Sequence, residues 1–215
     1  MKEVEMKRRG IMIVVSGFSG VGKGTLMKGL LKKYDKYALS ISATTRSPRV
    51  GEKEGEAYFF KTVEQFEKMI AEGELIEYAN YVGNYYGTPR DYVEKQLESG
   101  QDVILEIELQ GAMKVKEQLP DTLMLFVTTA NIAELVQRLE ERGTESADVI
   151  RSRMKRAFEE SKDMHNYDHL VINDDLATCV EDVHAVIQAE HFRTSRNKEL
   201  IDKIRKDLEE NVKGE

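Results

Sequence analysis

A glycine-rich segment, residues 17–25, lies between a short apolar run and an amphipathic stretch, and it restricts the fold more than any other feature. The apolar run, residues 11–15, is typical of a strand buried on both faces, and residues 25–33 have the pattern of a helix. The Gly-x4-Gly-Lys spacing lets the backbone turn so that successive N–H groups point inward at an anion. The helix that follows adds partial positive charge. This unit predicts an α/β core with a phosphate-binding loop, the P-loop.

The same alternation continues along the chain. Short apolar runs, each long enough for one strand, are separated by segments with the amphipathic pattern of helices. The expected strands are residues 11–15, 38–41, 103–107, 123–127 and 170–172, and the expected helices are residues 25–33, 110–118, 132–141 and 176–190. Strands and helices that alternate in this way predict an α/β fold in which helices cover both faces of a parallel sheet.

Two segments are too long for simple connections, and long inserts on a rigid sheet are usually functional. Residues 42–98 are aromatic and rich in turns, which predicts a small antiparallel sheet with helices, and residues 138–160 are dense in arginine and glutamate. Apolar residues at helical spacing in the tail, residues 193–215, predict an amphipathic helix that docks on the core or on a second subunit. A wholly solvated tail is the alternative. The core domain then comprises residues 1–41, 99–137 and 161–192.

Charge and cysteine content exclude several classes of protein. The chain has 32 Lys and Arg against 39 Asp and Glu, a formal net charge of −7, whereas a general nucleic-acid or acidic-membrane binder needs a broad basic surface. Cys179 is the single cysteine, so no internal disulfide is possible, and we expect a core residue in a reducing compartment. No apolar stretch is long enough to span a bilayer. We therefore expect a cytoplasmic protein that binds neither nucleic acid nor membranes.

Lys23 would add a full positive charge to the glycine-rich loop, at the β- and γ-phosphates of a nucleotide. The residue after this lysine is usually Ser or Thr, whose hydroxyl binds Mg²⁺, but here Gly24 and then Thr25 follow. We therefore expect Mg²⁺ to be held mostly by phosphate oxygens and water, with Thr25 as a metal-site residue acting through water. A plain strand-to-helix turn is the alternative, and the loop alone leaves kinase, ATPase and GTPase activities open. The residues expected to bind ATP are Gly17, Phe18, Ser19, Gly20, Val21, Gly22, Lys23, Gly24 and Thr25.

Further motifs occur in the first insert and at the end of the third expected strand. Residues 42–51 are Ser-Ala-Thr-Thr-Arg-Ser-Pro-Arg-Val-Gly, residues 83–88 are Gly-Asn-Tyr-Tyr-Gly-Thr, and residues 104–111 are Ile-Leu-Glu-Ile-Glu-Leu-Gln-Gly. With these motifs the sequence resembles the guanylate kinase family from about residue 11 to residue 190. The Gly-Lys-Gly-Thr ending of the P-loop also occurs among nucleoside monophosphate kinases. The resemblance implies transfer of the γ-phosphoryl group of ATP to GMP, and to dGMP, by a cytoplasmic monomer or homodimer.

Arg46 and Arg49, three residues apart around a proline, can converge as planar donors on one phosphate. Tyr58 and Tyr86 add hydroxyl donors, although such tyrosines can also serve only to pack a small domain. The resemblance assigns all four side chains to the phosphate of GMP.

Guanine offers N1–H and N2–H₂ donors beside an O6 acceptor. Carboxylates that accept from the donors, with hydroxyls that donate to O6, would therefore select guanine over adenine. The resemblance makes Glu77 and Glu108 the acceptors. Glu108 and Glu106 stand where aspartate is commoner in the family, and for Glu106 both placement of Mg²⁺-bound water and a structural role are open. The family's GMP site corresponds to Ser42, Arg46, Arg49, Tyr58, Glu77, Tyr86, Gly87, Thr88 and Glu108.

The second insert, residues 138–160, is implied to be a lid. Arg138 and Arg142 share one helical face, which on its own indicates a solvated helix paired with nearby glutamates. The Arg-Gly-Thr-Glu sequence that starts at Arg142 matches the family's lid and implies ATP contacts for Arg142 and Arg153. Asn173 is implied to contact the adenine base or its loop.

In the implied mechanism a phosphate oxygen of GMP is the nucleophile. No general base is needed, and catalysis depends on positioning and charge stabilisation. Lys23, Arg46, Arg142 and Arg153 are the expected catalytic residues. Two alternatives are a guanylate-kinase-like module that binds phosphorylated peptides without catalysis, and a kinase for another monophosphate such as AMP or dTMP. The intact P-loop favours the enzyme, and the hydroxyl and carboxylate set favours GMP.

Overall fold

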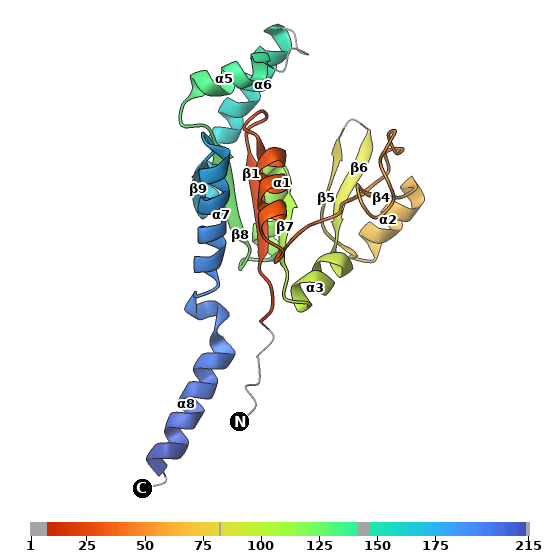
Figure 1. The fold of residues 1–215 in the computed structure, drawn as a ribbon. Helices are drawn as coiled ribbons and strands as arrows, with labels where there is room; N and C mark the ends of the chain where they lie inside the picture. Colours follow the sequence, from red (N-terminus) through yellow and green to blue (C-terminus); the bar gives the residue numbers. More distant parts are fainter. Residues whose placement is uncertain (1–7, 82, 142–146, 214–215) are drawn as a thin grey trace.

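The computed structural model describes residues 8–81, 83–141 and 147–213, and its centre is a five-stranded parallel sheet (Figure 1). The strand order is β2-β7-β1-β8-β9, so the strand before the P-loop is central. Every expected core strand is present, with ends shifted by one or two residues. The strands are β1 (Met12–Gly17), β2 (Tyr37–Leu39), β7 (Asp102–Glu106), β8 (Leu123–Thr128) and β9 (His169–Ile172).

Helices cover both faces of this sheet, as expected, because successive side chains of β1 point to opposite faces. Ile13 and Val15 pack in the cluster that includes side chains of α1 (Lys23–Lys33) and α7 (Leu176–Glu190). Met12 and Val14 pack on the other face with side chains of α3 (Arg90–Glu98) and α4 (Leu109–Gln118). Cys179 lies buried in α7, as expected of a core residue.

A second, smaller sheet lies beside the core (Figure 1) and has the order β4-β3-β6-β5. Its members are β3 (Ala43–Thr44), β4 (Phe59–Phe60), β5 (Leu75–Tyr81) and β6 (Asn84–Pro89), with α2 (Val63–Ala71) packed against them. The expectation of an antiparallel sheet holds for the β3–β6 and β5–β6 pairs. It is wrong for β3 and β4, which pair in parallel, because the intervening chain leaves the sheet and re-enters at the same end.

Two helices, α5 (Ile132–Glu141) and α6 (Ala147–Ser161), lie at the end of the sheet where the P-loop emerges (Figure 1). Leu135 and Leu139 anchor α5 in the main core, where both are about 1% exposed. Two short 3₁₀ turns, η1 (Met164–Asn166) and η2 (Thr194–Arg196), precede β9 and the tail.

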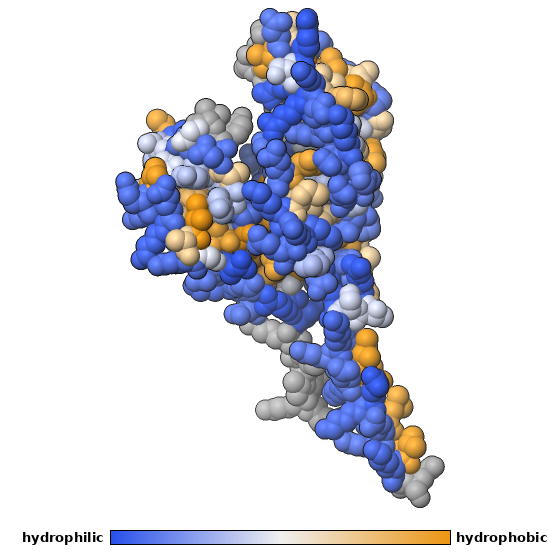
Figure 2. Space-filling view, turned by 180° about the vertical axis from the view of Figure 1, so that it is seen from behind, coloured by the Kyte–Doolittle hydropathy of each residue, from blue (hydrophilic) through white to orange (hydrophobic). Residues whose placement is uncertain are grey.

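The tail forms the expected helix, α8 (Lys198–Lys213), which projects from the end opposite to α5 and α6 (Figure 1). Every residue of α8 is exposed, so docking on its own core is not what the structure shows. Figure 2 shows its apolar side chains as a stripe along one edge. Within the described residues, none of the helices combines the length and the apolar character that a membrane crossing requires.

Candidate active site

The P-loop connects β1 to α1 in a backbone path that only glycine can follow. Gly17 and Gly20 have φ angles of 151° and 100°, in the region that side chains disfavour. A Cβ atom on Gly17 would lie 2.1 Å from the carbonyl oxygen of Val127 in β8, so the loop also presses against its neighbouring strand. The Lys23 ammonium donates to the carbonyl oxygens of Gly17 at 2.6 Å and Phe18 at 3.2 Å. The predicted loop is therefore formed with Lys23 beside it, and phosphate binding by Lys23 stays a prediction.

Two side chains support the P-loop by donating hydrogen bonds to the carbonyl oxygen of Val21. Asn173, at the end of β9 and 5% exposed, donates from Nδ2 to the carbonyl oxygen of Val21 at 2.7 Å. Arg138 of α5 donates to the same oxygen at 3.2 Å and to the carbonyl oxygen of Asn173 at 2.7 Å, and it also pairs with Glu134. The contact of Asn173 is thus with the loop. Arg142, the expected partner of Arg138, lies outside the described residues.

A pocket of about 480 Å³ opens between the P-loop, the end of β7 and helix α6. Ser19 and Lys23 line it from the loop, and Glu106 lines it from β7. Arg153 of α6 donates to Ser19 Oγ, so the second insert reaches the P-loop as the lid prediction requires. The remaining lining residues are Gly17, Ile107, Glu108, Leu109, Phe126, Ser152, Arg153, Arg156 and Glu160.

Arg156 is a functional candidate that the sequence analysis missed. It lies on α6 three residues after Arg153, on the same helical face, and this spacing was the available signal. Its guanidinium pairs with Glu108 and with Glu160, each at 2.8 Å. Glu108 therefore contacts helix α6 of the second insert, with its side chain 64% exposed.

A cationic and aromatic cluster forms on the second sheet. The Arg46 guanidinium lies 5.3 Å from the Tyr58 ring centre, and the Tyr58 and Tyr86 rings are 6.1 Å apart. Arg46 also donates to both carboxylate oxygens of Glu52, at 2.9 and 3.0 Å. These hydrogen bonds raise the pKa of Arg46 and lower the pKa of Glu52. The structure thus brings three of the four predicted phosphate ligands together around one guanidinium.

Glu52 is a second residue that the sequence analysis missed, because a glutamate among the charges of residues 51–56 is typical of a solvated turn. Its Oε2 accepts from the backbone N–H of Arg49 at 2.8 Å as well as from Arg46. The Arg49 side chain itself is exposed at this turn. Glu52 therefore fixes the turn that carries both arginines.

Glu77 lies buried on β5, where 7% of the residue is exposed. Its Oε1 accepts a hydrogen bond from Thr88 Oγ1 of β6 at 2.8 Å, and burial raises the pKa of the carboxyl group. Its Oε2 would lie 3.1 Å from a Cβ atom on Gly111, so the carboxyl group packs on the first turn of α4. The structure thus brings Thr88 and Glu77 together, and their contacts with guanine stay a prediction.

The other predicted residues of this site come from separate segments of the chain and differ in burial. Ser42 is half-buried just before β3, and its carbonyl oxygen accepts from the Phe59 N–H at 2.9 Å. Gly87 is buried in β6, where a Cβ atom would come within 2.8 Å of the Glu77 carbonyl oxygen. Glu108 is the N-cap residue of α4. It belongs to the same helix end as Gly111 but faces the lid.

The described residues contain no group of three or more His, Cys, Asp and Glu side chains that could enclose a metal ion. Thr25 is exposed in the first turn of α1. A divalent ion here would take most of its ligands from substrate phosphates and water, which fits Mg²⁺ better than a metal that needs a full protein cage.

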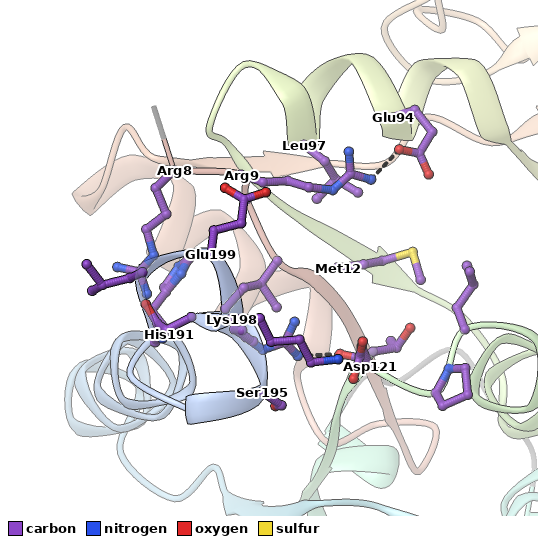
Figure 3. Close-up of a pocket in the computed structure, with 18 of the residues that line it drawn as sticks. Arg8, Arg9, Met12, Glu94, Leu97, Asp121, His191, Ser195, Lys198 and Glu199 are labelled. Atoms are coloured by element: carbon purple, nitrogen blue, oxygen red, sulfur yellow. Dashed lines mark hydrogen bonds and ion pairs between the residues drawn. The ribbon is translucent and has the colours of Figure 1, made fainter. Parts of the chain in front are cut away.

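The larger pocket in Figure 3, about 770 Å³, lies at the opposite end of the sheet. It is lined by Arg8, Glu94, His191 and the first residues of β1 and α8. Ligands of open α/β sheets bind at the carboxyl ends of the strands, where the P-loop lies, and this pocket is at the amino end of β1. The smaller pocket beside Lys23 is therefore the candidate active site.

The guanylate kinase family model matches residues 9–190. The chain is 48% identical over 204 residues to the guanylate kinase of Caldanaerobacter subterraneus subsp. tengcongensis, with 95% of this chain and 99% of that protein covered. It is 50% identical over 192 residues to the guanylate kinase of Bacillus subtilis, with 89% and 94% covered. The crystal structure of guanylate kinase from Anaplasma phagocytophilum matches with a TM-score of 0.68 and 30% identity, over 88% of this chain and 90% of that one. This chain belongs to the guanylate kinase family.

Proposed function

We propose that this protein catalyses the ATP-dependent phosphorylation of GMP to GDP, with dGMP as a further acceptor. The observation that carries the proposal is the connection between two sites through helix α4. Glu108, the N-cap residue of α4, lines the pocket that also contains Lys23, and Gly111 in its first turn packs against the buried Glu77. A nucleotide at the P-loop and a base at Glu77 would therefore meet across one helix end.

The chemistry is in-line phosphoryl transfer, in which a phosphate oxygen of GMP attacks the γ-phosphorus of ATP. The attacking oxygen is already anionic, so the protein supplies positioning and charge stabilisation and no general base. Lys23 and the lid arginines, Arg153 and Arg142, would neutralise the transferred group. Arg46, with the hydroxyls of Tyr58 and Tyr86, would hold the acceptor phosphate.

The choice of guanine would rest on Glu77. Its buried carboxylate can accept from N1–H and N2–H₂ of guanine, and the Thr88 hydroxyl beside it fixes its orientation. Adenine presents no matching donors at these positions and would leave a buried carboxylate unpaired, which disfavours its binding steeply. Ser42 and Glu108 complete the proposed base contacts.

The metal is proposed to be Mg²⁺ that arrives with ATP. Glu106 at the end of β7 lines the pocket and Thr25 is exposed in the first turn of α1, and we propose that these side chains approach the ion, Thr25 through water. When bound, Mg²⁺ neutralises charge on the β- and γ-phosphates. We also propose a cytoplasmic location, which the single buried cysteine supports, and a division into the core, a GMP-binding insert at 42–98, a lid at 138–160 and the tail at 193–215.

Steady-state kinetics with Lys23→Ala test the proposal. We expect turnover to be lost while the dissociation constant for GMP stays within about twofold of the wild-type value, because Lys23 contacts the P-loop at the end of β1, whereas Arg46 follows β3 of the second sheet. An equal loss of GMP affinity would contradict the assignment of Lys23 to the ATP site. A comparison of GMP, dGMP, AMP and dTMP as acceptors tests the base assignment. Absence of transfer to any of them would favour the phosphopeptide-binding alternative.

A further inference from the structure

Helix α8 is amphipathic but packs its apolar side against nothing in the described chain. Its apolar residues recur at the three- and four-residue spacing of one helix face, and their exposed fractions rise from 37% at Ile201 to 75% at Val212. An isolated helix of sixteen residues is only marginally stable in water, since most helical stability comes from packing of the apolar face. A partner for this face is therefore required. The apolar residues are Leu200, Ile201, Ile204, Leu208 and Val212.

The start of α8 is firmly attached to the core, so the direction of the helix is set (Figure 3). Asn197 donates to the carbonyl oxygens of His191 and Arg193, at 2.9 and 2.8 Å. Arg196 pairs with Glu190 at 3.0 Å and donates to the carbonyl oxygen of Asp121. With its start held in this way, α8 keeps its apolar residues exposed and open to a partner.

The charges on α8 identify the kind of partner. Residues 198–206 carry four basic and two acidic side chains, whereas residues 207–213 carry three acidic and one basic. The helix macrodipole favours acidic residues at the start of a helix and basic residues at its end, which is the opposite of this distribution. The charges therefore do not stabilise the isolated helix. An antiparallel copy of the same helix would place each basic half against an acidic half. A parallel copy would place like charges together.

We propose that α8 pairs antiparallel with α8 of a second copy of this chain, centred near Lys206. In this register Ile204 faces Leu208 of the other copy, and Ile201 faces Asn211. The whole helix has five basic and five acidic residues and no aromatic residue, which disfavours an anionic membrane surface as the partner. The paired segment is about 24 Å long, and an interface of this size forms a weak dimer, with a dissociation constant roughly in the micromolar range.

Sedimentation velocity of the full-length protein from about 1 to 200 µM tests the pairing. We expect a concentration-dependent dimer that the double variant Ile204→Gln/Leu208→Gln shifts to monomer, since glutamine keeps helix propensity but removes the apolar contact. The matched control is Lys32→Gln/Glu117→Gln, which changes two exposed side chains of α1 and α4, far from α8 in sequence, and leaves the net charge unchanged. Kinase turnover per chain should be equal in all three proteins. A wild-type monomer at every concentration would overturn the proposal, as would a dimer that persists in the double variant.

Charge reversal gives an independent test. Lys203→Glu/Arg205→Glu/Lys206→Glu leaves the helix with eight acidic and two basic residues and should abolish the homodimer. Mixing with chains that carry Asp207→Lys/Glu209→Lys/Glu210→Lys should restore a dimer. Failure of the mixture to associate would contradict the role of the charged halves. Sedimentation of the wild-type protein with anionic phospholipid vesicles, lost in the Ile204→Gln/Leu208→Gln variant, would instead assign the helix to a membrane surface and overturn the proposal.

Cysteine cross-linking decides the orientation, and the native Cys179 is buried and does not interfere. Chains with Ile201→Cys and chains with Asn211→Cys are oxidised separately and then as a mixture. In the antiparallel register the two introduced cysteines face each other, whereas identical positions lie about 15 Å apart along the axis. We expect a disulfide-linked dimer in the mixture only. Efficient cross-linking of either chain alone would show a parallel pair and refute the proposed arrangement.

Discussion

Glu77 occupies a position where the requirement of ligand binding opposes that of stability. The carboxyl group is buried, its hydrogen bond comes from the neutral Thr88 hydroxyl, and burial raises its pKa. A charged group in such surroundings destabilises the empty protein, and it becomes favourable when the guanine donors pair with it. The substitution Glu77→Gln separates the two effects, because the amide oxygen can still accept from Thr88.

We expect Glu77→Gln to stabilise the ligand-free protein by about 1 kcal/mol at pH 8, which raises Tm by roughly 3 °C for a domain of this size. The same change should lower kcat/KM for GMP roughly 150-fold, which corresponds to a loss of about 3 kcal/mol in transition-state stabilisation, since a charge-assisted hydrogen bond to the base is lost. The KM for ATP should not change, because Glu77 lies on the second sheet and not at the P-loop.

The stability gain should depend on pH with a defined sign. Because the folded-state pKa of Glu77 is raised, the folded wild-type protein holds more protons than the unfolded chain between the two pKa values. The stability of the wild type relative to Glu77→Gln therefore falls as the pH rises through the folded pKa. The advantage of the variant is full above that pKa and disappears below the ordinary range of a glutamate carboxyl group.

Thermal melts from pH 4 to pH 8, paired with GMP and ATP kinetics, measure these effects. Glu74→Gln on the exposed turn before β5 is the matched control and should change neither quantity. A variant that is less stable than the wild type at pH 8 would refute the reasoning about burial. An equal rise in the KM values of ATP and GMP would refute the assignment of Glu77 to the base.

Three further substitutions test the supports of the two anion sites. Glu52→Gln should raise the KM for GMP about tenfold by loosening Arg46, with ATP binding unchanged, and steady-state kinetics measure both. Asn173→Ala should raise the KM for ATP about tenfold and leave GMP binding intact, because the Val21 carbonyl would keep only the longer hydrogen bond from Arg138, and equilibrium titration with each nucleotide separates the outcomes. Gly20→Ala should destabilise the fold by about 1–3 kcal/mol, seen as a lower Tm, because its φ is 100° and its Cβ atom would lie 2.7 Å from Leu139. Gly24→Ala meets nothing within 4 Å and should not lower Tm, so equal losses for both glycines would contradict this explanation.

The core of the fold is predictable from sequence because a strand that is buried on both faces appears as a continuous apolar run. Ile13, Val14 and Val15 are all fully buried, and a run of this kind is hard to explain except as a central strand. The glycines of the P-loop are equally informative, since their φ angles exclude other residues. The parallel pairing of β3 with β4 was not predictable, because strands of two residues carry no periodicity that could fix their direction.

The candidate site was predictable where the family's motifs name the residue. The motifs named Arg46, Tyr58 and Tyr86, which the structure brings together, and also Glu77 and Thr88, whose hydrogen bond to each other was not predicted. The contacts that hold the site residues in place were not predictable, because most of them join distant segments of the chain. Asn173 reaches Val21 across 152 positions of the chain, and no local pattern signals that partner. Glu52 is close in sequence to Arg46, but a charged turn has the same composition whether or not it is ordered.

The contact of Arg46 with both carboxylate oxygens of Glu52 affects which phosphate compounds can compete for this site in the cell. A guanidinium that is already neutralised by a carboxylate exerts little residual attraction on free orthophosphate, which is abundant and would otherwise occupy an empty cationic site. Glu52 also holds Arg46 in position, so the phosphate of a ligand has to share the guanidinium with that carboxylate, and a ligand that also engages Glu77 through its base gains the binding energy to do so. The acceptor site should thus discriminate against inorganic phosphate and sugar phosphates before any step of catalysis.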